Sequence, residues 1–293
     1  MTSSFSKKHL DYPLQIELLE SRNLDILDHN FAIKKLKNLN YYRLTPYFYP
    51  FFEKKDYFKD GSTFEKIINL YDFDRELRTL VFKNIETIEV YIRAKLSFAV
   101  SKFKGAFGYL DKSSLNYKYQ DRHEKLLDDI NKEVSRSKEV FVEKYINEIG
   151  YLPVWAMVEV ISMGSLSMLY SYLDDEIRKD IVKDLGQKTF ILQSWLHTLT
   201  YIRNICAHHS RLWNRDLAIE PIVPRKNKKF SRINNKKIFF ILVIINELYT
   251  QIDIEQNTLL NDITILFEKY KDINIRAMGF PIDWQNYFIK VPR

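Results

Sequence analysis

The sequence contains little cysteine, glycine or proline, and each shortage argues against particular folds or binding sites. Its 293 residues include one cysteine, Cys206, which excludes an intramolecular disulfide and a zinc site built from several cysteines. Only 7 glycines and 8 prolines occur, which argues against tight-turned β architectures. Neither the P-loop pattern nor the dinucleotide-binding glycine pattern is present. We therefore expect no nucleotide cofactor.

Long apolar runs are also absent. The longest, Ile238 to Ile245, is far shorter than the roughly 20 residues that a membrane-spanning helix needs. The first residues, Met1 to Phe5, lack the apolar core of a signal peptide. These two observations predict a cytoplasmic protein with no membrane partner.

Aromatic residues and positive charge are abundant. The chain has 20 phenylalanines and 19 tyrosines, enough for a sizeable core, and a net charge of +7. Such a charge favours anionic partners, and nucleic acid first among them. Residues 225–237 carry seven cations and no acid. We predict that this stretch docks the RNA backbone, although a solvated loop would have the same composition. The candidate RNA-binding residues within it are Arg225, Lys226, Lys228 and Lys229.

Hydrophobic periodicity indicates an all-α fold. Apolar residues recur at spacings of three and four along most of the chain, and we find few convincing strands. Residues 64–103 form one long helix or two in tandem, with Ser62 or Thr63 as the N-cap and Gly105 near the end. The other predicted helices span residues 121–134, 140–149, 154–172, 174–185, 188–215, 236–252 and 257–270.

The first 60 residues differ in composition from the rest of the chain. Residues 39–52 are rich in tyrosine and phenylalanine and are interrupted by Pro46 and Pro50. Their rings could stack on unpaired bases or pack the segment onto the helical body. Packing is favoured, because aromatic side chains usually fill cores. We therefore divide the chain into an aromatic-rich segment, residues 1–60, packed on a helical domain, residues 61–293.

Residues 203–215 combine groups that no structural role obviously requires. Two cations, Arg203 and Arg211, flank a carboxamide, Asn204, and two adjacent imidazoles, His208 and His209. Cleavage of a phosphodiester requires a base near neutral pH, a fixed positive charge and a polar group to orient them. A metal site is not expected, because adjacent histidines on a helix diverge by about 100°.

A helical wheel of residues 188–215 separates this motif from an apolar stripe. The stripe contains Leu192, Trp195, Leu199, Ile202, Cys206 and Trp213. The opposite face carries Asn204, His208, Arg211 and Arg215, provided that the helix stays regular through His209 and Ser210. This polar face is either merely solvated or a surface that meets RNA, and a two-fold dimer would bring two copies of it together.

The motif also resembles a known family. Arg203 followed by Asn204 and then His208 is similar to the arginine–histidine motif of HEPN-superfamily ribonucleases. Together with four further blocks, residues 203–214 resemble AbiD/AbiF-like abortive-infection proteins of bacteria. Those blocks are Asn40–Leu44, Phe73–Arg78, Pro153–Val160 followed by Gly164–Ser167, and Gly279–Trp284.

The resemblance implies an α-helical HEPN bundle that cleaves RNA without metal or cofactor, at a composite site usually built from two HEPN units. Since this chain shows one motif, it implies a homodimer. It also implies a toxin of antiphage defence that acts by growth arrest. A structured noncoding RNA is a plausible partner, because some relatives are encoded beside one.

The expected reaction is attack by the RNA's own 2′-hydroxyl. His208 would move the proton, since histidine side chains ordinarily titrate near neutral pH, and His209 is the alternative imidazole. Arg203 would stabilise the transition-state charge. Asn204 would orient His208 or bind the phosphate, and Arg211 would hold a flanking phosphate.

Two carboxylates on other predicted helices each allow two interpretations. Glu159 lies on an otherwise apolar helix and either pairs structurally with a cation or orients Arg203. Glu89 and Arg93 are spaced as an ordinary helix pair, which we favour over a place in the site. Two other functions stay open, a non-catalytic protein that holds a structured noncoding RNA, and an interaction module whose motif serves dimer contacts.

Overall fold

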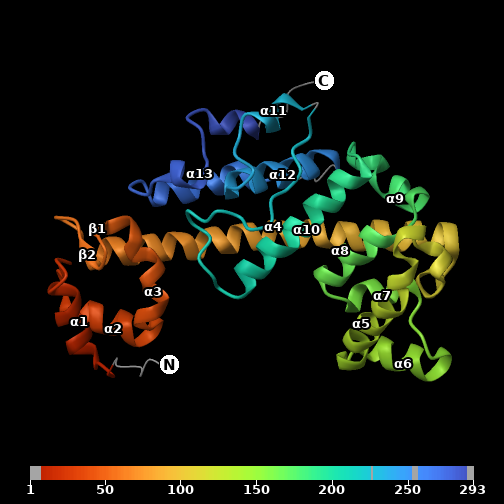
Figure 1. The fold of residues 1–293 in the computed structure, drawn as a ribbon, viewed down its shortest axis with the longest axis horizontal. Coiled ribbons are helices and arrows are strands. Elements are labelled where there is room, and N and C mark those ends of the chain that lie inside the picture. The colour runs from red at the N-terminus through yellow and green to blue at the C-terminus, as the bar shows by residue number, and fades with distance from the viewer. Residues whose placement is uncertain (1–7, 226, 253–256, 289–293) are drawn as a thin grey trace, which may run out of the picture. The chain divides into compact units, whose positions relative to one another are not determined.

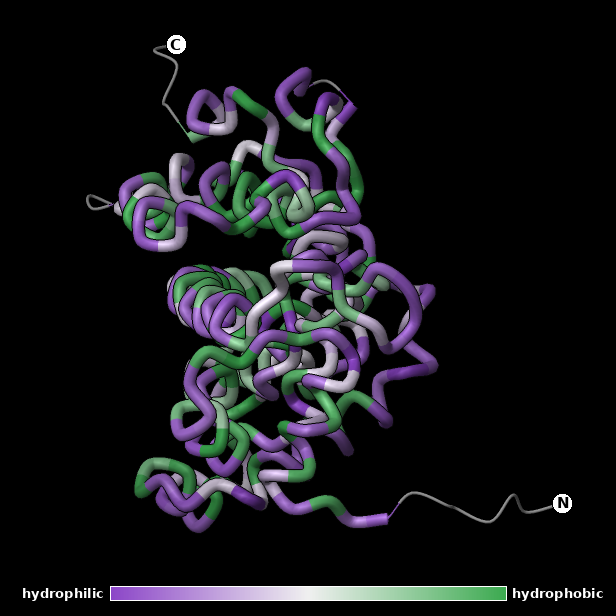
Figure 2. The backbone as a smooth tube through the Cα atoms, turned by 90° about the vertical axis from the view of Figure 1, so that its left-hand side faces the viewer, coloured by the Kyte–Doolittle hydropathy of each residue, from purple (hydrophilic) through white to green (hydrophobic). Residues whose placement is uncertain are grey.

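The computed structural model describes residues 8–225, 227–252 and 257–288, and within them the fold is almost entirely helical. The described residues form thirteen α-helices, seven short 3₁₀ turns and a single sheet of two strands (Figure 1). This confirms the predicted all-α class. Helical tubes in Figure 2 show green and purple segments in alternation, as helices with one apolar face require.

The chain divides into two compact units. The first comprises Met1–Leu77 with Leu266–Ile273, and the second comprises Arg78–Ile265 with Asn274–Arg293. Helix α4, Phe64–Lys104, contributes residues to both. The alternative of two tandem helices is therefore wrong for this segment.

Short helices with side-chain caps make up most of the first unit. They are α1 (Tyr12–Glu20), α2 (His29–Leu39) and α3 (Tyr41–Phe48), followed by a hairpin of β1 (Phe52–Lys54) and β2 (Tyr57–Phe58). Asp11, Asp28 and Asn40 cap the three helices by accepting backbone N–H groups. None of these helices was predicted, because the aromatic and proline content hides their periodicity.

Pro46 lies inside α3, where it has no N–H to donate to the carbonyl of Tyr42. The hydroxyl of Thr45 donates to that carbonyl instead, at 2.9 Å. The neighbouring side chain thus replaces the hydrogen bond that proline removes, and the helix continues to Phe48.

Aromatic side chains form the core of the first unit. Phe48 and Phe58 are at most 2% exposed, and their ring centroids lie 5.5 Å apart. Tyr47 is equally buried and packs edge-on against Tyr71. Packing is therefore the role of most of these rings. Tyr42 and Tyr49 are exceptions, at 66% and 70% exposed.

The hydroxyl of Tyr47 makes a buried polar contact in this core. It donates to a carboxylate oxygen of the fully buried Asp74 at 2.6 Å. Tyr47→Phe should lower the free energy of unfolding by about 2 kcal/mol, because hydrogen bonds to charged groups contribute about 1.5–3 kcal/mol. Urea unfolding followed by circular dichroism measures this. Tyr42→Phe, at an exposed ring in the same helix, should change stability by less than about 0.5 kcal/mol. Equal losses in the two variants would contradict the assignment.

The long helix α4, which contributes to both units, has clear boundary signals. The hydroxyl of Thr63 accepts the N–H of Lys66 at 3.2 Å just before α4, and Gly105 follows its last turn with φ +77°. Thr63 and Gly105 thus act as the sequence predicted. The helices that follow α4 are α5 (His123–Arg136), α6 (Val140–Ile149), α7 (Val154–Val160), α8 (Met163–Tyr172), α9 (Asp175–Val182), α10 (Thr189–Ala207), α11 (Lys228–Ser231), α12 (Ile238–Gln251) and α13 (Leu259–Lys269).

The helix predicted over residues 154–172 is broken in two. Chain direction changes at Ile161 and Ser162, and the Ser162 hydroxyl caps α8 by accepting the N–H of Ser165 at 3.2 Å. Glu133, from α5, accepts hydrogen bonds from the hydroxyls of Ser162 and Ser165. The carboxylate thereby stabilises a second helix start that periodicity alone does not reveal.

Helices α10 and α12 form the centre of the second unit. Helix α10 packs against α8 and α9, and α12 is buried on almost all sides. The Tyr249 hydroxyl of α12 donates to the carbonyl of Asn84 in α4 at 2.9 Å. None of the described helices has both the length and the apolar character that crossing a bilayer requires.

Candidate active site at the end of helix α10

Helix α10 is anchored by the apolar stripe that the sequence predicts. Leu192, Trp195, Leu199, Ile202 and Cys206 are all at most 5% exposed. Asn204, by contrast, is exposed, and Arg203 is partly exposed. The stripe therefore orients the start of the motif away from the core, and Cys206 is a buried core residue, as expected.

The helix ends eight residues earlier than predicted, at Ala207 rather than Arg215. His209 has φ +56°, in the left-handed region. Its N–H donates to the carbonyl of Cys206 at 3.1 Å, and that of Ser210 donates to the carbonyl of Ile205 at 3.0 Å. This is the hydrogen-bond pattern of a Schellman C-cap, in which glycine usually occupies the left-handed position. Because histidine occupies it here, no glycine marks the end of this helix in the sequence.

The early end divides the predicted polar face. The N–H of His208 still donates to the carbonyl of Asn204 at 3.0 Å, so these two residues remain one helical turn apart, and both are exposed. Arg211 and Arg215 lie beyond the helix, and the shared face predicted for all four residues is wrong. The Nε of Arg215 donates to the carbonyl of Arg211 at 2.7 Å.

Burial of the following segment explains why the chain turns. Leu212, Trp213 and Leu217 are at most 4% exposed, although a continued helix would turn Leu212 away from its apolar stripe. The N–H of Leu217 donates to the carbonyl of Lys236 at 2.8 Å. Further on, the indole N–H of Trp195 donates to the carbonyl of Ile222 at 3.1 Å. The segment therefore folds back along α10.

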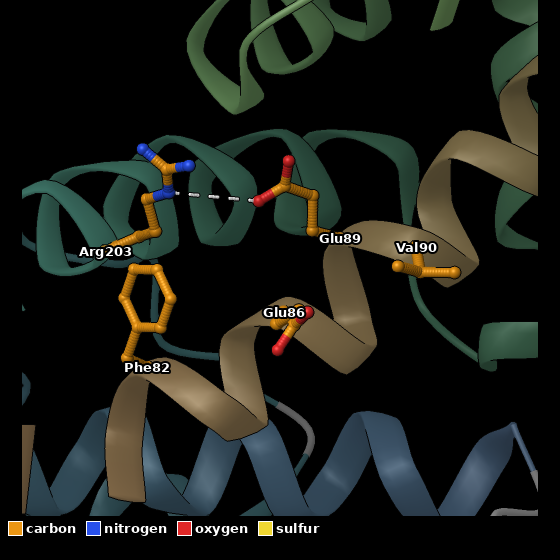
Figure 3. A pocket seen from close by; sticks show the side chains of 5 residues that line it. All are labelled: Phe82, Glu86, Glu89, Val90 and Arg203. Carbon is orange, nitrogen blue, oxygen red and sulfur yellow. Dashed lines mark ion pairs between the residues drawn. The ribbon is translucent and has the colours of Figure 1, made fainter. Parts of the chain in front are cut away.

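Arg203 projects into a hollow beside helix α4 (Figure 3). The hollow has a volume of about 230 Å³ and is lined by Phe82, Glu86, Glu89, Val90 and Arg203. The guanidinium carbon lies 5.6 Å from the centroid of the Phe82 ring, and Nε lies 4.0 Å from an oxygen of Glu89. The two terminal nitrogens point away from the ring. With 35% of the side chain exposed, these donors can reach a ligand.

Glu89 is shared between two arginines. One carboxylate oxygen pairs with Arg93, one turn further along α4, and the other faces Arg203. Arg93 also donates to the carbonyl of Val158 in α7. The side chains of Glu89 and Arg93 are only 12% and 11% exposed, so this pair is largely shielded from water.

The acidic neighbour of Arg203 is therefore Glu89, and the pairing considered for Glu159 does not occur. Glu159 is exposed on α7, next to the residue whose carbonyl binds Arg93. Glu89, interpreted from the sequence as half of an ordinary helix pair, contacts the motif instead. Sequence spacing cannot reveal this contact, because 114 positions separate the two residues in the chain (203 − 89).

The basic stretch forms a short structured segment rather than a uniform cationic loop. Arg225 and Lys228 are exposed, whereas Lys229 lies 3.9 Å from Glu247 and is half-buried in α11. Burial lowers the pKa of the Lys229 ammonium, and the nearby Glu247 carboxylate only partly opposes this. Lys229 is thus committed to the fold. Lys226 lies outside the described residues.

Comparison with known proteins places this site within a family. The family model for Abi-like proteins matches residues 34–214, which include α4, all of α10 and the motif after it. The chain belongs to the Abi-like protein family. Membership suggests a role in abortive-infection defence. No curated protein and no solved structure matches the chain significantly.

In this Abi-like protein, the structure brings together Arg203, Asn204 and His208 at one helix end, and adds Glu89 and Phe82 from α4. Phe82 was missed because an aromatic residue at helical spacing is typical of a core. Among the described residues, no cluster of three or more histidine, cysteine or acidic side chains is arranged to hold a metal ion.

The left-handed residue gives a direct test of the helix end. A Cβ in this conformation costs about 1–2 kcal/mol. His209→Gly should therefore be more stable than His209→Ala by about 1 kcal/mol, measured by thermal or urea unfolding. Both variants lack the imidazole, so its other contacts cancel in the comparison. At His208, where φ is −88°, the order should be reversed or neutral. An advantage of glycine at both positions would contradict this helix end.

Proposed function

We propose that this Abi-like protein is a HEPN-type endoribonuclease that acts in abortive-infection defence. One observation carries the proposal. Arg203, held beside Glu89 with its terminal nitrogens outward, shares a helix end with the exposed Asn204 and His208. A fixed cation, a carboxamide and an imidazole are the groups that metal-independent phosphodiester cleavage requires.

The proposed reaction is an internal transesterification. An imidazole removes the proton of a ribose 2′-hydroxyl, whose oxygen attacks the adjacent phosphorus while the bond to the 5′-oxygen breaks. A protonated imidazole donates a proton to that leaving oxygen. The products carry a 2′,3′-cyclic phosphate and a 5′-hydroxyl. Arg203 stabilises the additional charge on the phosphorus-bound oxygens during attack.

Helix geometry favours a homodimer for this chemistry. Arg203 and His208 are separated by about 140° around an ideal helix axis, so one copy presents them to different sides. A two-fold axis near the end of α10 would place Arg203 of one copy beside His208 of the other. The same dimer supplies two imidazoles, one as base and one as acid. We assign the reaction to the cytoplasm, where RNA substrates occur.

Cleavage of single-stranded RNA in the presence of EDTA is the direct test. The protein should produce fragments with 2′,3′-cyclic phosphate ends, and His208→Ala should lower the rate at least about 100-fold, because general acid–base catalysis contributes about 10²–10⁴-fold. Gel separation of end-labelled RNA measures both. Arg203→Ala should have a comparable effect.

His197→Ala is the matched control for this experiment. His197 is an exposed histidine of α10, about 16 Å upstream of His208 and on nearly the same side of the helix. Its loss should leave the rate unchanged. If the wild type, His208→Ala and Arg203→Ala all bind RNA and none cleaves it, the protein only holds an RNA. Loss of all cleavage under EDTA would reject the metal-independent scheme.

The basic segment makes a separate prediction about RNA affinity. Lys228→Gln should weaken RNA binding and reduce the slope of log affinity against log salt by about 0.7, as expected for one lost phosphate contact to a single strand. Lys229→Gln should leave the affinity nearly unchanged, because Lys229 is half-buried beside Glu247. Titrations monitored by fluorescence anisotropy at several salt concentrations measure the difference. Equal effects of the two substitutions would show that Lys229 also contacts RNA.

A further inference from the structure

We propose that Glu89 and Arg93 are positioning residues that hold the Arg203 guanidinium in place for phosphate binding. This inference rests on the proposed function for its catalytic consequence, and on the described contacts for its geometry. In this proposal, the residues that line the hollow of Figure 3 hold in place the cation that the reaction needs.

The first argument is geometric. The Nε of Arg203 is buried and makes no hydrogen bond, and the closest acidic oxygen, on Glu89, is 4.0 Å away. An ion pair without a hydrogen bond restrains the guanidinium without occupying its donors. Phe82 lies against the guanidinium and limits its movement toward α4. Arg203 is therefore restrained by charge and by an aromatic ring, while its terminal nitrogens stay available.

The second argument concerns what holds Glu89. A carboxylate beside a single arginine would rotate to form a bidentate pair and occupy its donors. Here Arg93 binds one oxygen of Glu89 and is itself fixed by the carbonyl of Val158. Arg93 thus prevents Glu89 from closing onto Arg203. This explains why the distance to Arg203 stays at 4.0 Å.

The third argument is the charge balance of the cluster. Glu89 alone would neutralise Arg203 and weaken its attraction for a phosphate. With Arg93 included, two guanidinium groups and one carboxylate leave a net charge of +1. Because the cluster is partly shielded from water, that charge acts on a bound anion with less screening than at an open surface. The three residues thus form an oriented cation, and the remaining carboxylate of the hollow, Glu86, is exposed to water and makes no ion pair with Arg203.

The experiment compares Glu89→Gln with Glu86→Gln. Both remove one negative charge from the lining of the same hollow, but Glu86 is exposed and no ion pair joins it to Arg203. Glu89→Gln should lower kcat about 10- to 100-fold, since displacement of a catalytic group by about 1 Å has an effect of this size. Its KM should not rise, because removing a negative charge favours RNA binding. Glu86→Gln should retain kcat.

Glu89→Asp keeps the charge with a shorter side chain, and its kcat should lie between those of the wild type and Glu89→Gln. A purely structural role would lower the melting temperature of Glu89→Gln while leaving kcat per folded molecule unchanged, and would overturn the inference. So would an equal loss of kcat in Glu86→Gln.

Arginine Nε–Hε NMR spectra separate this inference from the proposed function. The signal of Arg203, assigned by its loss in Arg203→Lys, should shift or broaden in Glu89→Gln and stay unchanged in Glu86→Gln. If the wild type does not cleave RNA, the proposed function fails while this spectrum still tests the positioning. An unperturbed Arg203 signal in Glu89→Gln would overturn the positioning role in either case.

Discussion

The left-handed turn at His209 is the constraint on which the candidate site depends. It ends α10 at Ala207, so that Asn204 and His208 lie on the last turn of a well-anchored helix. A continuous helix would have carried Arg211 and Arg215 on the same face and turned Leu212 away from the apolar stripe. Burial of Leu212 favours the turn, since a buried leucine side chain contributes roughly 1.5–3 kcal/mol, against about 1–2 kcal/mol for the strained residue.

Shared charge determines the environment of Arg203. A single carboxylate, Glu89, serves two guanidinium groups that come from different helices. Charged groups in partly buried positions are costly unless each has a partner of opposite charge. Here one carboxylate, Glu89, is the partner of both guanidinium groups. The partly exposed member of the cluster, Arg203, lies at the helix end with Asn204 and His208. The same three side chains thus stabilise the Glu89–Arg93 pair and keep the Arg203 guanidinium available to a ligand.

Regular helices with ordinary boundary residues could be predicted closely. Residues 140–149 were predicted as a helix closed by Gly150, and they form α6 with Gly150 in the left-handed conformation. The predictions failed where a side chain replaces the usual signal. Thr45 supports a helix through Pro46, and Ser162 with Glu133 restarts a helix within an apolar run. These substitutes act through hydrogen bonds that depend on rotamers or on distant segments, which local periodicity does not encode.

The sequence by itself determined the helical class, the apolar stripe of α10 and the spacing of Arg203, Asn204 and His208, because these follow from local periodicity and composition. Family membership also follows from the sequence. Only the tertiary structure decided which carboxylate faces Arg203, which lysine is committed to the fold, and where α10 ends. Each of these depends on contacts between residues far apart in the chain, and such contacts form only when the helices pack.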